Sequence, residues 1–432
     1  MGRPTLEACM DHASLRIPLA DRADGERPVT ETQAAEHIAA TAFLPDDPER
    51  IGAEVEWLVT AEGERRFHPE RLRSLLLSRG ALPTRTALSF EPGGALELSA
   101  GPHTSLRECF YALESDRRRI AAALGTIGAG LLGIGLDPER PPHRLLRSRR
   151  YQAMEQLFDQ DGRAGRWMMA NTASIQVCVD AGADGAEGGG HRSLQDRWAL
   201  VHRLAPVLLA VFANSPFARG KAGPWRSARQ HVWSAVDRTR TGPVSAHDPR
   251  GSWARYALDA HVMAVRGEEH WLVPERLTFR EWIRTGSPRP ATFADLEYHL
   301  TTLFPPVRPR GRYIELRMID SQPGRDWIVP VAVVSALLED PRANDAAWAA
   351  VERLWTDCPR ASELYARAAS AALHNAPLAA AARACLTAAR EALARSGADA
   401  EILALVDDFA ARHTFRSLTP ADLLLRRRPG VR

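Results

Sequence analysis

The stretch "IGAEVEWLV", Ile51 to Val59, places two glutamates inside an apolar run. A period of two is typical of a β-strand, so Glu54 and Glu56 are expected on the same face. An ionised carboxylate that is removed from water costs several kcal/mol unless something compensates its charge. The segment therefore predicts a strand with one acidic face that needs a cationic partner.

Acidic residues recur in other segments with the character of strands. Glu91 and Glu97 lie in "ALSFEPGGALELSA", a predicted hairpin, and Glu315 lies between two apolar residues in "RYIELRMID". An isolated acidic residue of this kind is usually an exposed edge position, but three strands repeat the pattern. Hard divalent cations such as Mg²⁺ take carboxylate oxygens as ligands and bridge to phosphate oxygens. The pattern therefore favours a multi-carboxylate magnesium site on a sheet surface.

One arginine shares this expected face. Arg317 follows Glu315 by two residues, so both side chains point the same way. A cation beside a carboxylate–metal site is expected where phosphoryl charge develops. A cross-strand salt bridge with one of the glutamates explains Arg317 equally well.

A segment rich in arginine, Ser215–Pro243, reads "SPFARGKAGPWRSARQHVWSAVDRTRTGP". Within it, Arg229, Trp233, Asp237 and Arg240 recur at helical spacings of four, four and three. Such a face could form a solvated ladder of ion pairs. A tryptophan between charges instead favours a shaped pocket, in which an arginine would pair with a small carboxylate substrate.

Composition limits the classes of function. The 432 residues carry a net charge of only +3, so nothing predicts a nucleic-acid partner. Apolar runs stay shorter than the ~18 residues that a membrane span needs. The five cysteines lack metal-ligand spacing, which predicts reduced thiols rather than disulfides or zinc. A cytoplasmic protein without a membrane partner is expected.

The order of segments predicts an α+β fold with a mainly antiparallel sheet. Residues 1–29 are expected to form a flexible leader, followed by a capped helix over Thr30–Phe43. The stretch "WMMANTASIQVCVD", Trp167 to Asp180, alternates as a further strand. From residue 331 to 432 the chain is rich in alanine and predicts a helical region packed on the main domain, 30–330.

Two glycine-rich segments mimic nucleotide-binding motifs. Gly128–Gly133, "GAGLLG", matches the dinucleotide fingerprint letter for letter. However, a helix is expected before it and a strand after it, whereas phosphate binding needs a strand, a turn and then a helix. Gly185–Gly190 lacks the Lys-Ser/Thr of a P-loop. These segments are therefore predicted to be a tight turn and a surface loop.

Seven segments together resemble the second type of glutamate–cysteine ligase, which includes plant and proteobacterial enzymes. They follow the family's order over about residues 50 to 330: "IGAEVEWLV", "FEPGGALELSAGP", "RYQAM", "MMANTASIQVCVD", "FANSPFARGKAGPWRSARQHVWSAVDRTRTGP", "WARYALD" and "LEYHLTTLFPPVRPRGRYIELRMIDSQP". The chain's length and its Arg/Ala-rich character resemble the shorter actinobacterial enzymes of ergothioneine synthesis.

This resemblance implies a fold and a reaction. The fold would be a curved, glutamine-synthetase-like antiparallel sheet with ATP and magnesium ions in its concave face, in a monomer or small homo-oligomer. ATP would phosphorylate the γ-carboxylate of L-glutamate, and the amine of L-cysteine would attack the acyl phosphate. The products would be γ-glutamylcysteine, ADP and phosphate. Such phosphoryl transfer needs positioning and charge more than a covalent protein group.

The resemblance also implies roles for individual residues. The metal-holding positions would be Glu54, Glu56, Glu97, Glu315 and Gln176. The catalytic positions would be Arg317, which faces the transferred phosphate, and Glu56. The nucleotide-binding positions would be Asn171 and Arg317. The substrate-binding positions would be Arg229, for the glutamate α-carboxylate, with Trp233, Arg149, Tyr151 and Tyr256.

One segment departs from the family pattern. After "RYALD" the chain reads "AHVMAV", where plant relatives tend to carry a Pro-Met-aromatic sequence. The acceptor pocket therefore has two interpretations, a cysteine site or a site for a different amino acid or amine. The regulatory cysteine pairs of the plant enzyme have no counterpart, so control by a disulfide is not expected.

Overall fold

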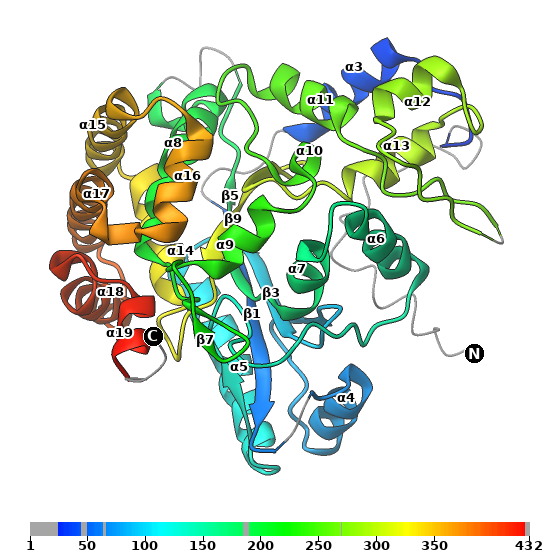
Figure 1. Cartoon of the computed structure of the whole chain (residues 1–432). Coiled ribbons are helices and arrows are strands. Elements are labelled where there is room, and N and C mark those ends of the chain that lie inside the picture. The colour runs from blue at the N-terminus through cyan, green and yellow to red at the C-terminus, as the bar shows by residue number, and fades with distance from the viewer. Residues whose placement is uncertain (1–24, 45–49, 64–65, 185–189, 269, 428–432) are drawn as a thin grey trace.

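The computed structural model describes residues 25–44, 50–63, 66–184, 190–268 and 270–427 (Figure 1). Within these ranges, no helix is both long and apolar enough to cross a membrane. The expected loop at 185–190 lies almost entirely outside the described residues.

A single mixed-length sheet forms the centre of the molecule. Its strand order is β2-β3-β1-β5-β9-β8, and β4 pairs with the second half of β1. All of these pairings are antiparallel, which confirms the predicted sheet type. The strands are β1 (Ile51–Ala61), β2 (Ala87–Phe90), β3 (Leu96–His103), β4 (Ala129–Leu132), β5 (Ser174–Asp180), β8 (Val307–Pro309) and β9 (Tyr313–Asp320).

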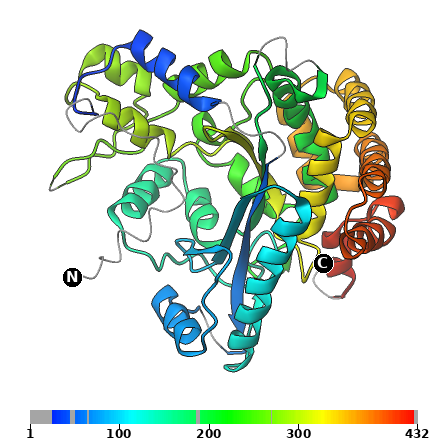
Figure 2. The same ribbon diagram turned by 180° about the vertical axis from the view of Figure 1, so that it is seen from behind.

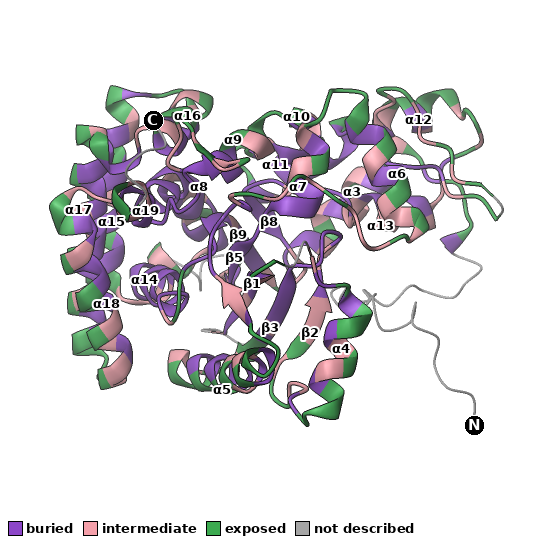
Figure 3. Cartoon of the chain, turned by 60° about the horizontal axis from the view of Figure 1, so that its bottom comes forward, coloured by how far each residue is buried: buried purple, intermediate pink, exposed green. Residues whose placement is uncertain are grey.

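Strand β1 alternates apolar and acidic residues, which suits its place in the middle of the sheet. Ala53, Val55 and Trp57 are at most 1% exposed and belong to the main hydrophobic core, while Glu54 and Glu56 face the other side. Helices α5 (Leu106–Gly125), α8 (Leu194–Val211) and α14 (Ile328–Glu339) pack on the sheet. In Figure 3 the strands are mostly buried and α5 turns its exposed side away from them. The core therefore occupies the apolar face and leaves the acidic face for a site.

Further helices cover the sheet's acidic face and one end. These elements are α3 (Glu31–Ala42), α4 (Pro69–Ser78), α6 (Arg149–Asp159), α7 (Ala164–Asn171), α9 (Ala228–Ser234), α10 (Arg238–Thr241), α11 (Pro249–Asp259), α12 (Phe279–Thr285) and α13 (Phe293–Leu300), with a hairpin of β6 (Phe217–Ala218) and β7 (Lys221–Ala222). Thr30 and Gln33 form the predicted capping box of α3. Of the expected leader only 25–29 are described, and there Val29 is buried and donates its N–H to Ala291.

The C-terminal region is helical, as expected, but its boundary is not at residue 331. That position falls inside α14, whose sequence is apolar on every side, so the helix is buried between the sheet and the later helices. Those helices form a layer beside α8 and α14 (Figures 1 and 2). They are α15 (Pro341–Asp357), α16 (Ala361–Ser370), α17 (Ala376–Arg395), α18 (Ala400–Arg412) and α19 (Pro420–Arg427).

Three local expectations have clear outcomes. Gly128 ends the turn after α5, and Ala129–Leu132 form β4 itself, so the helix, turn and strand follow in the order that the context predicted, although most of the segment is strand rather than turn. Trp167–Asn171 was expected to alternate as a strand, but it lies in α7, because the strand signal begins only at Ser174. The helical spacing from Arg229 to Arg240 is interrupted: α9 ends at Ser234, and Asp237 caps α10. Asp237 and Arg240 instead form a buried pair with each other.

Candidate active site

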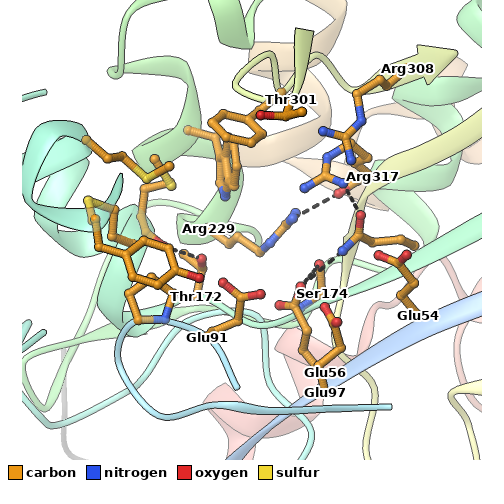
Figure 4. A pocket seen from close by; sticks show the side chains of 18 of the residues that line it. Glu54, Glu56, Glu91, Glu97, Thr172, Ser174, Arg229, Thr301, Arg308 and Arg317 are labelled. Carbon is orange, nitrogen blue, oxygen red and sulfur yellow. Dashed lines mark hydrogen bonds between the residues drawn. The ribbon is translucent and has the colours of Figure 1, made fainter. Parts of the chain in front are cut away.

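A cavity of about 190 Å³ opens over the acidic face of the sheet. Residues of β1, β3, β5 and β9 form its floor, and residues of α6, α7 and α9 form its walls. Figure 4 shows carboxylates on one side of this cavity and the guanidinium groups of Arg229, Arg308 and Arg317 across from them. Opposite charges thus gather around one space, which suits an anionic ligand bound together with a cation.

Three carboxylates converge in this cavity. One oxygen each from Glu56, Glu91 and Glu97 lies within 4.8 Å of the others. Glu56 and Glu97 are direct cross-strand partners on β1 and β3, while Glu91 follows β2 at the start of the hairpin turn. Like charges placed directly opposite each other repel, so the fold brings together groups that need a shared counter-charge.

The surroundings of these carboxylates resist their ionisation. Burial raises the pKa of Glu97 to about 7, with a further contribution from Glu56. Burial also raises the pKa of Glu91 well above its usual value, and that of Glu54 to about 8, with Glu315 adding to the latter. These carboxylates lie close together and are costly to ionise without a counter-charge. Such a set of oxygen ligands suits a hard divalent cation.

Hydrogen bonds fix the orientation of two of the three. Glu56 accepts from the backbone N–H of Ser174 at 2.7 Å, from its hydroxyl at 3.0 Å and from the Gln176 amide at 3.2 Å. Glu97 accepts from the hydroxyls of Ser89 and Ser99 at 2.6 and 3.3 Å. These donors hold the carboxylates in place before any ligand arrives, as metal ligands usually require.

Glu315 differs from the other predicted metal positions. It is fully buried, does not line the cavity, and is bonded by Arg308 at 2.8 Å and by Arg317 at 2.6 Å. Burial opposes its ionisation, but the two arginines outweigh that effect and lower the pKa of Glu315 to about 2. Its second oxygen, Oε1, lacks a hydrogen-bond partner among the described residues. Arg317 therefore forms a salt bridge with a glutamate, but along its own strand β9 rather than across strands as the sequence allowed. The metal role of Glu315 stays a prediction.

Arg317 and Arg229 form the cationic side of the site. Arg317 donates to Glu315 and to the side chain of Gln176, and it lines the cavity. Arg229 is 3% exposed, lies 5.6 Å above the ring of Trp233, and donates to the backbone carbonyl of Arg317 at 2.8 Å. Its buried Nε has no partner among the described residues, and Arg229 lines the cavity.

The family comparisons bear directly on this arrangement. The family model described as "Glutamate-cysteine ligase family 2" matches residues 50–431, and so spans every element of the site.

The chain belongs to glutamate–cysteine ligase family 2.

Two curated members of this family are close relatives. The chain is 39% identical over 347 residues to "Glutamate–cysteine ligase EgtA" of Mycolicibacterium smegmatis, covering 77% of this chain and 79% of that protein. It is likewise 39% identical over 346 residues to the EgtA of Mycobacterium tuberculosis, covering 76% and 77%. A crystal structure of a Francisella tularensis glutamate–cysteine ligase in complex with AMP matches with a TM-score of 0.51 at 14% identity, covering 90% of this chain and 87% of that one. The expected glutamine-synthetase-like fold is confirmed.

The family's use of ATP implies a divalent metal, and the residues present fit one. Glu56, Glu91 and Glu97 supply oxygen ligands within a common sphere. The sequence pattern included Glu91, but Glu91 was not among the predicted metal-holding positions. The feature that could have indicated Glu91 is the glycine turn that follows it. Gly93 approaches α7 so closely that a Cβ there would lie 1.9 Å from the carbonyl oxygen of Ala170. This close contact folds the turn over the acidic face.

Other substrate positions are placed differently from expectation. Tyr151 lines the cavity, but Arg149 is exposed and donates to the carbonyl of Glu268 at 2.8 Å. Its neighbour Arg150 lines the cavity instead, and it is held by the hydroxyl and carbonyl of Thr301 at 2.9 Å. One residue turns a helix by about 100°, so a shift of one position decides which arginine faces inward.

Two further predicted positions lie outside the cavity wall. Tyr256 is stacked on Trp253 with ring centroids 5.5 Å apart, and its hydroxyl has no described partner. Asn171 is buried, accepts from Arg66 at 3.0 Å and donates to the carbonyl of Arg140 at 2.6 Å. Asn171 thus joins α7 to a neighbouring loop, and its predicted contact with a nucleotide has no support from its position.

A buried carboxylate that sequence reasoning missed anchors the Arg229 segment. Asp320, at the end of β9, accepts from the Asn214 backbone N–H at 2.9 Å and from the hydroxyls of Ser215 and Ser227 at 2.7 and 3.0 Å. Ser227 caps α9, and the Ser215 hydroxyl also accepts from the backbone N–H of Arg229. Asp320 therefore fixes the start of the helix that carries Arg229.

We expect Asp320→Asn to lower the free energy of unfolding by about 2–3 kcal/mol. The amide keeps the volume but replaces one of the two acceptor oxygens by an NH2 group, which then faces an existing donor and leaves buried groups unsatisfied. Equilibrium unfolding in urea checks this, with the exposed carboxylate replacement Asp357→Asn as the matched control. Equal midpoints for both variants would contradict the anchoring role.

Proposed function

We propose that this chain is an ATP-dependent glutamate–cysteine ligase. It joins the γ-carboxylate of L-glutamate to the amine of L-cysteine through a γ-glutamyl phosphate and releases ADP and phosphate. The observation that carries this proposal is one cavity that holds the carboxylate set and the two cations Arg229 and Arg317. The EgtA relatives support a cytoplasmic role in supplying ergothioneine synthesis.

Magnesium is the proposed metal, with Glu56, Glu91 and Glu97 as ligands and with Glu54, Gln176 and Glu315 as further candidates. When bound, it would neutralise phosphate oxygens and help align the γ-phosphate with the attacking carboxylate. Oxygen-only donors favour such a hard cation over zinc or copper. Gln176 bridges the two charged sides of the site, since it donates to Glu56 and accepts from Arg317.

The protein's own groups act mainly by positioning and by charge. Arg229 is placed to bind the α-carboxylate of glutamate, because its guanidinium is buried, preorganised on Trp233 and not fully satisfied. Arg317 is placed to stabilise the negative charge that spreads over the transferred phosphoryl group. Once the acyl phosphate has formed, the cysteine amine attacks its carbonyl carbon and phosphate leaves with the bonding electron pair.

The position of the segment "AHVMAV" supports a second candidate for the acceptor amine. Met263 in "AHVMAV" is 1% exposed and belongs to a hydrophobic cluster with Met154, Met168 and Met169, three residues that line the cavity. The segment that departs from the plant pattern thus backs one wall of the site. A different amino acid or amine could therefore replace cysteine as acceptor.

A coupled assay of ADP release tests the function. We expect turnover only when L-glutamate, ATP and a divalent cation are present, and we expect L-cysteine to support it at least about tenfold better than other acceptors, a margin worth about 1.4 kcal/mol. Mass spectrometry of the product identifies the γ-linkage. ADP release that is indifferent to cysteine would overturn the assignment, while a strong preference for another amine would select the second candidate.

We expect Arg229→Met to raise KM for L-glutamate by about 30- to 100-fold, since a charge-assisted bond is worth about 2–3 kcal/mol. KM for ATP should change much less. Steady-state kinetics check this, with Arg353→Met, an exposed arginine on α15, as the control. An unchanged KM for glutamate would remove Arg229 from the carboxylate site.

A further inference from the structure

A second cavity, of about 770 Å³, lies away from the acidic face. It is bounded by α8, α15, α16 and the loop after α10, and includes His202, Arg203, Val244, Glu352, Trp355 and Tyr365. Figure 1 shows α8, α15 and α16 side by side at the edge of the helical layer. Its volume is in the range of small-molecule sites, about 300–1,000 Å³.

Two buried polar side chains in this cavity lack partners. His202 and Tyr365 are each 6% exposed, and both His202 Nε2 and the Tyr365 hydroxyl have no hydrogen-bond partner among the described residues. The other ring nitrogen of His202, Nδ1, faces the carbonyl of Trp198 at 2.8 Å and must donate to it. Burial lowers the pKa of His202 to about 4, so Nε2 is an acceptor at neutral pH. Buried groups of this kind usually find a partner.

The cavity also offers one charge of each sign. The Arg203 guanidinium lies 5.7 and 5.9 Å from the rings of Trp348 and Trp355 and forms no ion pair with any described residue. Glu352 lies between these tryptophans on α15, at helical spacings of four and three. The lining thus includes a cation and a carboxylate, the two charges that a zwitterion needs, while Trp355 and Tyr365 offer aromatic surface.

We propose that this cavity is an effector site for a free α-amino acid with an aromatic side chain. Arg203 would take the carboxylate and Glu352 the ammonium group. The side chain would lie against Trp355, and its N–H or O–H would donate to His202 Nε2 or pair with the Tyr365 hydroxyl.

The walls of the cavity connect to the candidate active site. Ala369, one turn after Tyr365 on α16, accepts the backbone N–H groups of Arg226 and Ser227 at 2.8 and 2.9 Å. These contacts fix the N-terminus of α9, which carries Arg229. A ligand that moves α16 would thereby change the placement of Arg229, so the effect should fall on KM for glutamate. This last step rests on the proposed function, whereas binding itself does not.

Isothermal titration calorimetry of the full chain tests the site, with L-tryptophan, L-tyrosine and L-histidine as probes. At least one should bind at one site per chain with a dissociation constant below about 1 mM. For the tryptophan series, tryptamine and indole-3-propionate, which lack one charge each, should bind at least tenfold more weakly. Arg203→Met and Tyr365→Phe should weaken binding of the amino acid, whereas the control Arg353→Met should not. Saturating L-glutamate should shift the dissociation constant only by about the factor by which the amino acid shifts KM for glutamate, without abolishing binding.

Three outcomes would overturn the proposal. They are no saturable binding of any probe, equal binding by Arg203→Met and the parent chain, and displacement by L-glutamate, which would place the ligand in the catalytic cavity. The linked assay measures KM for glutamate with and without the bound amino acid, and we expect a change of at least threefold that Arg203→Met abolishes. Binding without any such change would overturn the effector role. An inactive protein that still binds the probe would refute only the ligase proposal.

Discussion

Replacing Glu56 by glutamine should reduce kcat for ligation by at least about 10³-fold, or about 4 kcal/mol of transition-state stabilisation. Glu56 lies at the centre of the carboxylate set, between Glu97 across the strand pair and Gln176 on β5. The amide keeps the shape of the side chain but removes the charge and one acceptor oxygen. Ser174, which donates twice to Glu56, would then face an N–H group or lose a bond.

The same variant should also lose the stabilisation that magnesium and ATP give the folded chain. A ligand at one hundred times its dissociation constant stabilises by about 2.7 kcal/mol, so the parent chain should melt measurably higher with both present. Thermal melts with and without magnesium and ATP measure this stabilisation independently of turnover. Glu36→Gln, an exposed replacement on α3, is the control. An undiminished gain for Glu56→Gln would remove Glu56 from the metal site.

The sequence predicts the sheet and its acidic face because both depend on local alternation. In β1 and β9 each residue's neighbours along the chain determine which face it occupies, so Glu54, Glu56 and Arg317 were predicted to share one site and do line one cavity. Glu315 was on the predicted strand together with Arg317, but the second arginine that covers it, Arg308, is its partner on the neighbouring strand β8. Strand pairing, which is non-local, decides which charge is exposed to a ligand.

Other parts of the site depend on geometry that no local pattern encodes. Glu91 faces the cavity because a hairpin turn packs against α7, and Arg150 replaces Arg149 because the phase of α6 is set by its packing. In the sequence, Asp320 is an ordinary residue at the end of a strand. Its role becomes visible only in the folded chain, where the hydroxyls of Ser215 and Ser227 donate to it. Family resemblance supplied functional segments, but tertiary contacts decided the individual residues.

Arg317→Met should lower kcat and kcat/KM for glutamate together, by about 10²- to 10³-fold, because its charge is needed most when phosphoryl charge develops. The fold should survive the change. Glu315 remains paired with Arg308, and Arg229 donates to the backbone carbonyl of Arg317 rather than to its side chain. Arg317→Lys, which retains a positive charge but not the planar fork, should recover part of the lost rate.

Steady-state kinetics with varied glutamate and ATP, together with thermal melts of both variants, separate catalysis from folding. A purely structural role for Arg317 predicts a lower melting temperature and no recovery by lysine beyond the recovery of folded protein. A purely binding role predicts a raised KM for one substrate at unchanged kcat. Arg317 contacts both Glu315 and Gln176, and Gln176 contacts Glu56. A lower kcat at unchanged KM would therefore place Arg317 at the reacting phosphate. Gln176, which contacts both Arg317 and Glu56, would then link the cationic side of the site to its metal-binding side.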